Sequence, residues 1–481
     1  MASSALKRKT AKGLFWGGFS NGITQLVGLA YGIVLARRLS QEDYGIVALL
    51  AIFTGIAGTL SGGGFSIALT NKQDAGHRDY NAVFWFSTLM SVFLYVVMFC
   101  LAPIVAGFYD TPELTVLSRV FCITFITSGA AVTAHTVMFK RMMVKRLAVI
   151  DILSLFVSCS AGLYLAFTVG SYWAIAVQVV LYISVASILK IIVAPWRPTF
   201  DIDFSPLKQM FPFSIKLVLT SIFSSIYAYV LPSMLGKLYN LSDVGNYNQG
   251  QKWSTMGHTL TSTMIGYVVQ PVLVESGENR SRRVAVIRKL IRFGAFISFP
   301  LMLGLAFVGR EFIVIAIGEK WLPAVPFLQL SCIWGAVMFL FTIFGNVIYT
   351  NGKSGMYMTA TITTGMMQML AVILMYPYGI LPMVGAYVAM SVVGLFVWHY
   401  YVDRLVGLPL RFVFRDIFPY LFLTVLCIFV AWLLTGGIDN LYVKFFLKVA
   451  ITVLLYVIVL WAGKSVIFRE SISFLTKTYK K

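Results

Sequence analysis

Charged residues are scarce in this chain. Asp, Glu, Lys and Arg make up only 12% of its 481 residues, whereas a soluble protein of this size carries roughly 25%. Apolar residues account for 59%, and they come in runs of about 20 residues, the length needed to cross a bilayer as a helix. The scarcity of charge therefore excludes an ordinary soluble protein and indicates an all-α polytopic membrane protein.

Cysteine is scarce as well. The chain has five cysteines, each inside an apolar run, and none forms a CxxC pair or lies near a cluster of histidines. We expect them to be small packing residues, and the sequence supports neither a disulfide framework nor a metal site. They are Cys100, Cys122, Cys159, Cys332 and Cys427.

Catalytic motifs are missing too. The sequence contains no GxxxxGK phosphate loop, no HExxH helix and no GxSxG elbow. The connections between the apolar runs are short, so we expect no catalytic domain outside the membrane. The sequence therefore predicts neither an enzyme nor a protein with a cofactor.

The apolar runs predict about fourteen membrane spans. The first follows Lys7, Arg8, Lys9 and Lys12, continues to Ala36 and lacks the cleavage site of a signal peptide. The spans are expected near 12–36, 45–69, 82–107, 117–138, 147–169, 172–194, 210–235, 247–273, 286–309, 325–350, 355–377, 380–402, 416–435 and 442–463.

The distribution of positive charge predicts the orientation of these spans. With the N-terminus inside, most of the 38 Lys and Arg residues fall in inward connections or in the tail, residues 464–481. By the positive-inside rule both termini are expected in the cytoplasm, which requires an even number of spans. The net charge of +20 then indicates contact with anionic lipid, and a nucleic-acid partner is not expected.

One short phrase occurs twice, 200 residues apart. Residues 35–45 read LARRLSQEDYG and residues 235–245 read LGKLYNLSDVG, and each copy lies between two apolar runs. Weaker matches pair the third expected span with the ninth and the start of the sixth with that of the twelfth. The repeat predicts two six-helix lobes of the same orientation, 1–195 and 196–403, an architecture typical of transporters. Residues 404–481 fall outside the repeat and are expected to form two further spans and a basic cytoplasmic tail.

Each copy of the phrase carries an acidic residue two positions before a glycine. These are Asp43 before Gly45 and Asp243 before Gly245. An acid favours the N-terminus of a helix, and a glycine permits a tight entry into it. We therefore expect helix capping at both places, with direct substrate contact as the alternative.

Polar side chains within the apolar runs are the candidates for a binding site, because at membrane depth each must face protein or water. The eighth expected span begins with the polar run 246–251, followed by Lys252 and His258. Asn21 and Gln25 share one face of the first span through their i,i+4 spacing. The seventh span, the repeat partner of the first, is rich in Ser, Thr and Tyr.

We expect these spans to line a polar cavity between the two lobes. No Asp or Glu lies in the middle of an expected span, and cations with amides but no acids suit an anionic, hydroxyl-rich ligand. An interfacial position is the alternative for Lys216, near a cytoplasmic end, and for Lys252, beside Trp253. The candidate cavity residues are Asn21, Gln25, Lys216, Tyr227, Asn248, Gln249, Gln251, Lys252 and His258.

Five segments carry a resemblance to a known family. They are LARRLSQEDYGIVAL (35–49), DYNAVFWFSTLMS (79–91), APIVAGFYDTPEL (102–114), DVGNYNQGQKW (243–253) and GEKWLPAVPFLQL (318–330). Over nearly its whole length the chain resembles the polysaccharide exporters and lipid-linked oligosaccharide flippases of the multidrug/oligosaccharidyl-lipid/polysaccharide superfamily. Among them it is most similar to the colanic-acid-exporter branch.

The resemblance implies two six-helix lobes plus two terminal helices, around a V-shaped cavity that opens to each side of the membrane in turn. It implies an undecaprenyl-pyrophosphate-linked oligosaccharide as cargo and the bacterial inner membrane as location. A polysaccharide polymerase and its assembly machinery are the implied partners in lipopolysaccharide or exopolysaccharide export. Cavities of the family are cationic, and Lys216 and Lys252 are the matching positions here, while the first span offers Asn21 and Gln25 instead of arginine.

Two alternatives to this function stay open. An ion-coupled multidrug or small-solute antiporter would share the fold, but the missing mid-span carboxylates argue against it. A membrane polysaccharide polymerase or glycosyltransferase would need a long outward loop with catalytic residues, and the sequence predicts no such loop.

Overall fold

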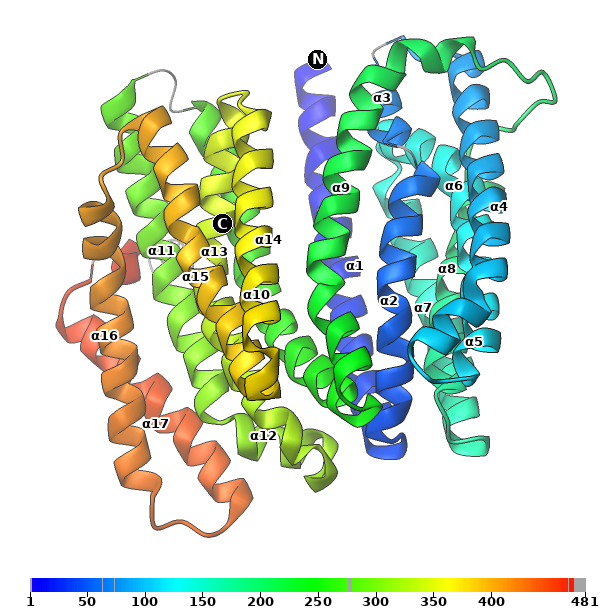
Figure 1. Ribbon diagram of the computed structural model, residues 1–481. Helices are drawn as coiled ribbons and strands as arrows, with labels where there is room; N and C mark the ends of the chain where they lie inside the picture. The colour runs from blue at the N-terminus through cyan, green and yellow to red at the C-terminus, as the bar shows by residue number, and fades with distance from the viewer. Residues whose placement is uncertain (1, 63, 73, 276–278, 466, 471–481) are drawn as a thin grey trace. The chain divides into compact units, whose positions relative to one another are not determined.

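The computed structural model describes residues 2–62, 64–72, 74–275, 279–465 and 467–470. Within these ranges the regular structure is helical, and no strand occurs. In Figure 1 the long helices of each part of the chain run alongside one another. The predicted all-α polytopic fold is confirmed.

The helices follow one another through short connections. Up to the middle of the chain they are α1 (Ala2–Arg38), α2 (Gln41–Gly62), α3 (Phe65–Asn71), α4 (His77–Phe108), α5 (Glu113–Phe121), α6 (Ile123–Lys140), α7 (Val144–Thr168), α8 (Trp173–Val193), α9 (Ser205–Leu238) and α10 (Leu241–Glu275). The rest of the chain forms α11 (Arg280–Phe307), α12 (Gly309–Ile317), the 3₁₀ turn η1 (Glu319–Ala324), α13 (Val325–Thr350), α14 (Ser354–Met375), the 3₁₀ turn η2 (Tyr376–Tyr378), α15 (Ile380–Val406), α16 (Leu410–Thr435) and α17 (Leu441–Ala462).

Ten described stretches are long and apolar enough to cross a membrane. They comprise α4, α5 with α6, α7, α8, α11, η1 with α13, α14 with η2, α15, α16 and α17. Four other long helices, α1, α2, α9 and α10, coincide with the first, second, seventh and eighth expected spans. The number of fourteen spans stays a prediction.

The chain divides into two compact units, Met1–Gly245 and Asn246–Lys481. The boundary lies near the start of α10, so the first unit includes α9, which packs along α2. The lobes expected from the repeat, 1–195 and 196–403 with 404–481 apart, divide the chain elsewhere. These lobes were defined by the internal sequence repeat, and the division into lobes stays a prediction.

Small residues let the helices of the first unit approach closely. α6 packs on α4 at Gly129, where a Cβ atom would lie 1.8 Å from the hydroxyl oxygen of Ser91. α7 packs on α1 at Gly162, where a Cβ atom would lie 2.2 Å from the hydroxyl oxygen of Tyr31. Small residues at crossings are the usual means of close helix packing in membranes, so larger side chains at either position would separate the helices.

The two copies of the repeated phrase meet within the first unit. A Cβ atom on Gly45 would lie 2.0 Å from the backbone oxygen of Leu241, and one on Gly245 would lie 1.9 Å from that of Gln41. The two contacts are equivalent, because Gln41 and Leu241 occupy the same position of the repeat. The Ser242 hydroxyl also donates to Oε1 of Gln41 at 2.6 Å. The N-termini of α2 and α10 therefore cross reciprocally, each glycine against the start of the other helix.

Helix capping at the first copy is confirmed. The backbone N–H and the hydroxyl of Ser40 donate to Oδ2 of Asp43 at 2.8 and 2.7 Å. Oδ1 of Asp43 accepts the backbone N–H of Tyr172 at 2.7 Å, which ties α2 to the start of α8. In the second copy the capping side chain is Asn240, whose Oδ1 accepts from the backbone N–H of Asp243 at 2.8 Å. Asp243 itself lies in the first turn, where its charge favours the helix N-terminus.

Two ion pairs fasten α16 and α17 to the rest of the second unit. Asp416 of α16 is 4% exposed and accepts two hydrogen bonds from Arg288 of α11, at 2.7 and 3.0 Å. Lys448 of α17 pairs with Glu311 of α12 at 2.7 Å, and both side chains are nearly buried. The two helices outside the sequence repeat are therefore each held by one ion pair, α16 to α11 and α17 to α12.

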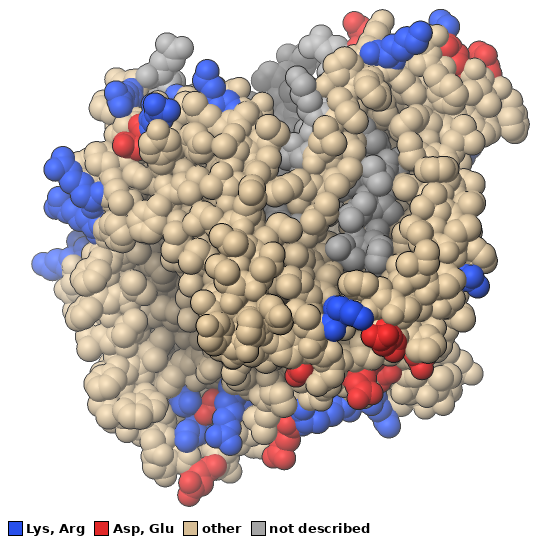
Figure 2. Space-filling view, in the orientation of Figure 1, with Lys and Arg blue, Asp and Glu red and all other residues tan. Residues whose placement is uncertain are grey.

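Charged side chains lie mainly toward the ends of the helices. Figure 2 shows most Lys, Arg, Asp and Glu atoms in these places on each unit, with a broad tan surface between them. This distribution fits a multi-pass membrane protein. The cytoplasmic location of the two termini stays a prediction.

Candidate functional site

Five of the candidate cavity residues lie on α10. Gln249 and His258 are buried, with 0% and 7% of their surface exposed, whereas Asn248, Gln251 and Lys252 are half-buried. At 1.5 Å of rise per residue, the five are spread over about 15 Å of helix. One helix therefore carries three amides, a cation and an imidazole over half the thickness of a ~30 Å hydrocarbon core.

Several buried polar atoms of α10 have no hydrogen-bond partner among the described residues. Leaving one such atom unpaired costs about 1–3 kcal/mol, and the groups of a native protein normally avoid this cost. A membrane-length helix that keeps many of them is a candidate for contact with polar ligand groups. The atoms are Asn246 Oδ1, both amide atoms of Gln249, Trp253 Nε1, Ser254 Oγ, both ring nitrogens of His258, and Ser262 Oγ.

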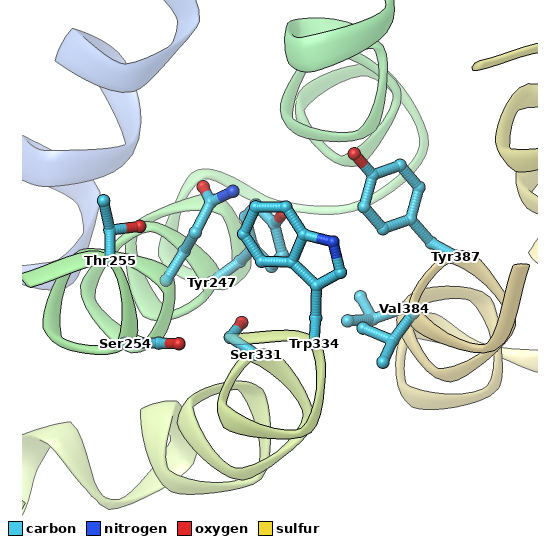
Figure 3. A pocket seen from close by; sticks show the side chains of 9 residues that line it. Tyr247, Ser254, Thr255, Ser331, Trp334, Val384 and Tyr387 are labelled. Atoms are coloured by element: carbon cyan, nitrogen blue, oxygen red, sulfur yellow. The ribbon is translucent and has the colours of Figure 1, made fainter. Parts of the chain in front are cut away.

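A pocket of the second unit joins α10 to α13 and α15. Figure 3 shows the Trp334 indole at its centre, between the α10 side chains and Tyr387 of α15. The cavity measures about 20 Å³, which is room for one water molecule or one hydroxyl group. Its lining residues are Tyr247, Gln251, Ser254, Thr255, Ser331, Trp334, Val384, Tyr387 and Val388. Hydroxyl and amide groups thus surround an aromatic face.

His258 contacts the central aromatic residue of this pocket. Its ring packs edge-on against the Trp334 indole, with the ring centroids 5.1 Å apart. The structure therefore brings two predicted residues, Gln251 and His258, together with an aromatic residue that the sequence did not single out. Trp334 lies inside an apolar run, where an aromatic side chain looks like a packing residue. Tyr387 had a weak signal, because it belongs to the matching starts of the sixth and twelfth expected spans.

Lys252 is the cation of this helix. Its ammonium group lies 5.8 Å from the centroid of the adjacent Trp253 ring. Among the described residues, no acidic side chain forms an ion pair with it. A half-buried cation without an acidic neighbour favours contact with an anionic ligand.

The remaining candidates lie in the first unit. Asn21 and Gln25 are exposed on α1, one turn apart. Lys216 and Tyr227 belong to α9, and their side chains lie outside the described residues. A common cavity of these four residues with those of α10 stays a prediction.

Acidic residues near the helix ends are engaged in ion pairs. Asp79 pairs with Lys72 at 2.8 Å and Asp151 with Lys190 at 3.2 Å. In the part of the chain that the structure describes, no group of three or more His, Cys, Asp or Glu side chains could hold a metal ion.

Polar side chains along a membrane-length helix of an all-α membrane protein are typical of membrane transporters. Comparison with known proteins identifies the family of this chain. The family described as "Polysaccharide biosynthesis protein" matches residues 34–326, more than half of the chain, and the chain belongs to this family.

Two relatives and one solved structure illustrate the similarity. The teichuronic acid biosynthesis protein TuaB of Bacillus subtilis (strain 168) is 24% identical over 352 residues, which cover 73% of each chain. The lipopolysaccharide biosynthesis protein WzxC of Escherichia coli (strain K12) is 21% identical over 355 residues, covering 73% of this chain and 71% of its own. The lipid II flippase MurJ, in an inward closed conformation, has a similar fold: the TM-score is 0.73 at 12% identity, over 95% of this chain and 100% of that one. The predicted resemblance to polysaccharide exporters and flippases is confirmed.

Proposed function

We propose that this transporter moves a lipid-linked oligosaccharide across the bacterial inner membrane by alternating access. Membership of a polysaccharide biosynthesis family supports the glycan, and the fold shared with a lipid II flippase supports the lipid-linked form. The observation that carries the proposal is the polar stretch of α10 around Lys252, where several buried amide and hydroxyl groups have no hydrogen-bond partner among the described residues.

The chemistry of an undecaprenyl-pyrophosphate-linked sugar chain matches these side chains. In this proposal the Lys252 ammonium binds the pyrophosphate, because a cation at membrane depth interacts strongly with a phosphate. Gln251 and Ser254 hydrogen-bond a sugar hydroxyl in the pocket beside Trp334, which has room for one such group. The lipid tail stays in the bilayer while the head group passes the polar cavity.

The sequence repeat supports alternating access. Two lobes of similar structure can rock about a site between them, so the cavity opens to one side of the membrane at a time. With both termini in the cytoplasm, the lipid-linked oligosaccharide enters the cavity from the cytoplasmic side, where most Lys and Arg residues are expected. A polysaccharide polymerase and its assembly machinery then receive it on the outward side.

A deletion strain tests this function. Without the protein, lipid-linked oligosaccharide accumulates on the cytoplasmic side and surface glycan is lost, and the full-length chain restores both. The two leaflets are distinguished by a sugar-oxidising or lectin probe that cannot cross the membrane. If the outward leaflet receives the oligosaccharide at the normal rate in the deletion strain, the proposed function is wrong.

A further inference from the structure

An apolar groove runs between α11 and α17 in the second unit. Its volume is about 490 Å³, and its walls come from residues 296–307 of α11, the following Val308 and residues 448–457 of α17, with Phe468 at one end. The groove is wide at Gly304, because this residue has no side chain and nothing lies within 4 Å of the position that a Cβ atom would take. We call this cavity the α11–α17 groove.

The groove has the length of one hydrocarbon chain in one leaflet. Residues 296–308 rise by about 18 Å along a helix, slightly more than half of a ~30 Å hydrocarbon core. Leu301, Val453 and Val457 on its walls are 38%, 55% and 41% exposed, so the groove opens sideways, toward lipid. A water molecule there would find almost no polar partner, whereas a hydrocarbon chain would contact apolar side chains along its length.

At the Phe307 end of the groove, a lysine is neutralised by an acidic residue. The Lys448 ammonium, which lies 2.7 Å from Glu311 Oε1, also donates to the Phe307 backbone oxygen at 3.5 Å. Lys448 therefore offers its methylene stem to the groove. This end therefore offers no net charge to a headgroup.

The other end of the groove is basic. Arg292 lies one turn before Phe296 on α11, and its Nε is 3.6 Å from Asp416, a carboxylate that Arg288 already binds with two hydrogen bonds. Two guanidinium groups thus share one acid, which leaves a surplus positive charge. The exposed Arg469 follows Phe468, the residue that covers this end.

Lys289 adds no net charge to this end, because it pairs with Glu470 at 2.7 Å. By the positive-inside rule the basic end of α11 faces the cytoplasm. Basic side chains beside a groove between membrane helices on that face are suited to an anionic lipid headgroup.

We propose that the α11–α17 groove binds one acyl chain of an anionic diacyl phospholipid, whose phosphate lies against Arg292 and Arg469. The length of the groove favours such a lipid over a polyprenyl carrier, whose chain is much longer than the groove. The acyl chain would fill the space between α11 and α17, one of the two helices outside the sequence repeat. The proposal does not depend on the glycan function.

Native mass spectrometry of the full-length protein in mild detergent tests this site. After delipidation, the protein is titrated with phosphatidylglycerol, with phosphatidylcholine of the same acyl chains, and with a polyprenyl phosphate. We expect one phosphatidylglycerol per chain, and phosphatidylcholine bound about tenfold more weakly. The polyprenyl phosphate is expected not to displace it.

Matched variants locate the site. Val453→Trp fills the groove and should abolish the bound phosphatidylglycerol, whereas Leu454→Trp, at the next residue and 59% exposed but outside the lining, should keep it. Arg292→Gln with Arg469→Gln should remove the preference for the anionic headgroup, and Lys353→Gln, on an exposed turn, should not. Unchanged thermal midpoints show that the variants fold.

Three results would overturn the proposal. Equal binding of both phospholipids removes the headgroup contact. Equal loss in Val453→Trp and Leu454→Trp, or no loss in either, removes the groove. Displacement of phosphatidylglycerol by the polyprenyl phosphate assigns the groove to the carrier lipid.

Discussion

At the scale of single residues, Lys252 offers the sharpest test of the binding site. Its ammonium has an adjacent indole but no acidic partner among the described side chains, so its charge is available to an anionic head group. We predict that Lys252→Ala abolishes surface glycan without lowering the protein level, and that Lys252→Arg keeps most of the activity. Surface glycan and protein level are measured in a deletion strain that carries each variant.

The matched control for this prediction is Lys353→Ala, which removes a lysine from an exposed turn of the same unit. This variant should make a normal amount of glycan. If Lys252→Ala also makes normal glycan at the same protein level, Lys252 does not bind the pyrophosphate.

Gly45 and Gly245 form the second testable feature at residue scale. A Cβ atom added at either glycine would lie 2.0 Å or less from a backbone oxygen in the other copy of the phrase. Backbone atoms cannot move aside as the end of a side chain can. We predict that Gly45→Ala and Gly245→Ala each destabilise the protein by about 1–3 kcal/mol. The thermal midpoint of the purified protein measures this loss.

Gly22→Ala is the control, because nothing lies within 4 Å of that Cβ position on α1. There the change should be neutral or stabilising by up to ~1 kcal/mol, since alanine favours helix more than glycine does. Equal midpoints for all three variants would contradict the reciprocal crossing of α2 and α10.

At the scale of elements, the helices were predictable because apolar runs of span length stand out against short polar connections. α4, α13 and α16 contain the expected spans 82–107, 325–350 and 416–435. The polar residues of α10 were predictable for the same reason, since amides and a lysine are conspicuous within an apolar stretch. Trp334 was not, because its role depends on which helix faces it.

Pairings between distant helices were also beyond the sequence pattern. Glu311 was expected in a connection, and Lys448 in an apolar run, 137 residues later. Nothing local relates the two, yet the packing of α12 against α17 makes them one buried pair. Long-range partners of this kind require the fold itself.

The Lys448–Glu311 pair gives the prediction at element scale. Glu311→Gln leaves the Lys448 charge nearly buried without its acid, and losing one partner of a buried pair costs about 3–5 kcal/mol. We therefore expect a clear fall in thermal midpoint, which Lys448→Met in the same chain largely reverses by removing the isolated charge.

An exposed ion pair supplies the comparison. Lys237 and Asp110 lie 3.0 Å apart with side chains 40% and 82% exposed, and such pairs contribute about 0–1 kcal/mol. Lys237→Gln should therefore barely change the midpoint. If Glu311→Gln is equally mild, the pair does not hold α17 in place.

At the scale of the whole molecule, orientation links the charge pattern to the proposed direction of transport. An even number of spans with cytoplasmic termini puts the connection before α17 outward and the connection before α9 inward. Asp439 and Asp201 are exposed residues of these two connections.

We predict that a membrane-impermeant maleimide labels Asp439→Cys in intact spheroplasts, and Asp201→Cys only after the membrane is opened. The chain without either substitution shows the background from its own five cysteines. The reverse labelling pattern would turn the basic end of α11 outward and would remove the cytoplasmic entry of the glycan together with the cytoplasmic headgroup site.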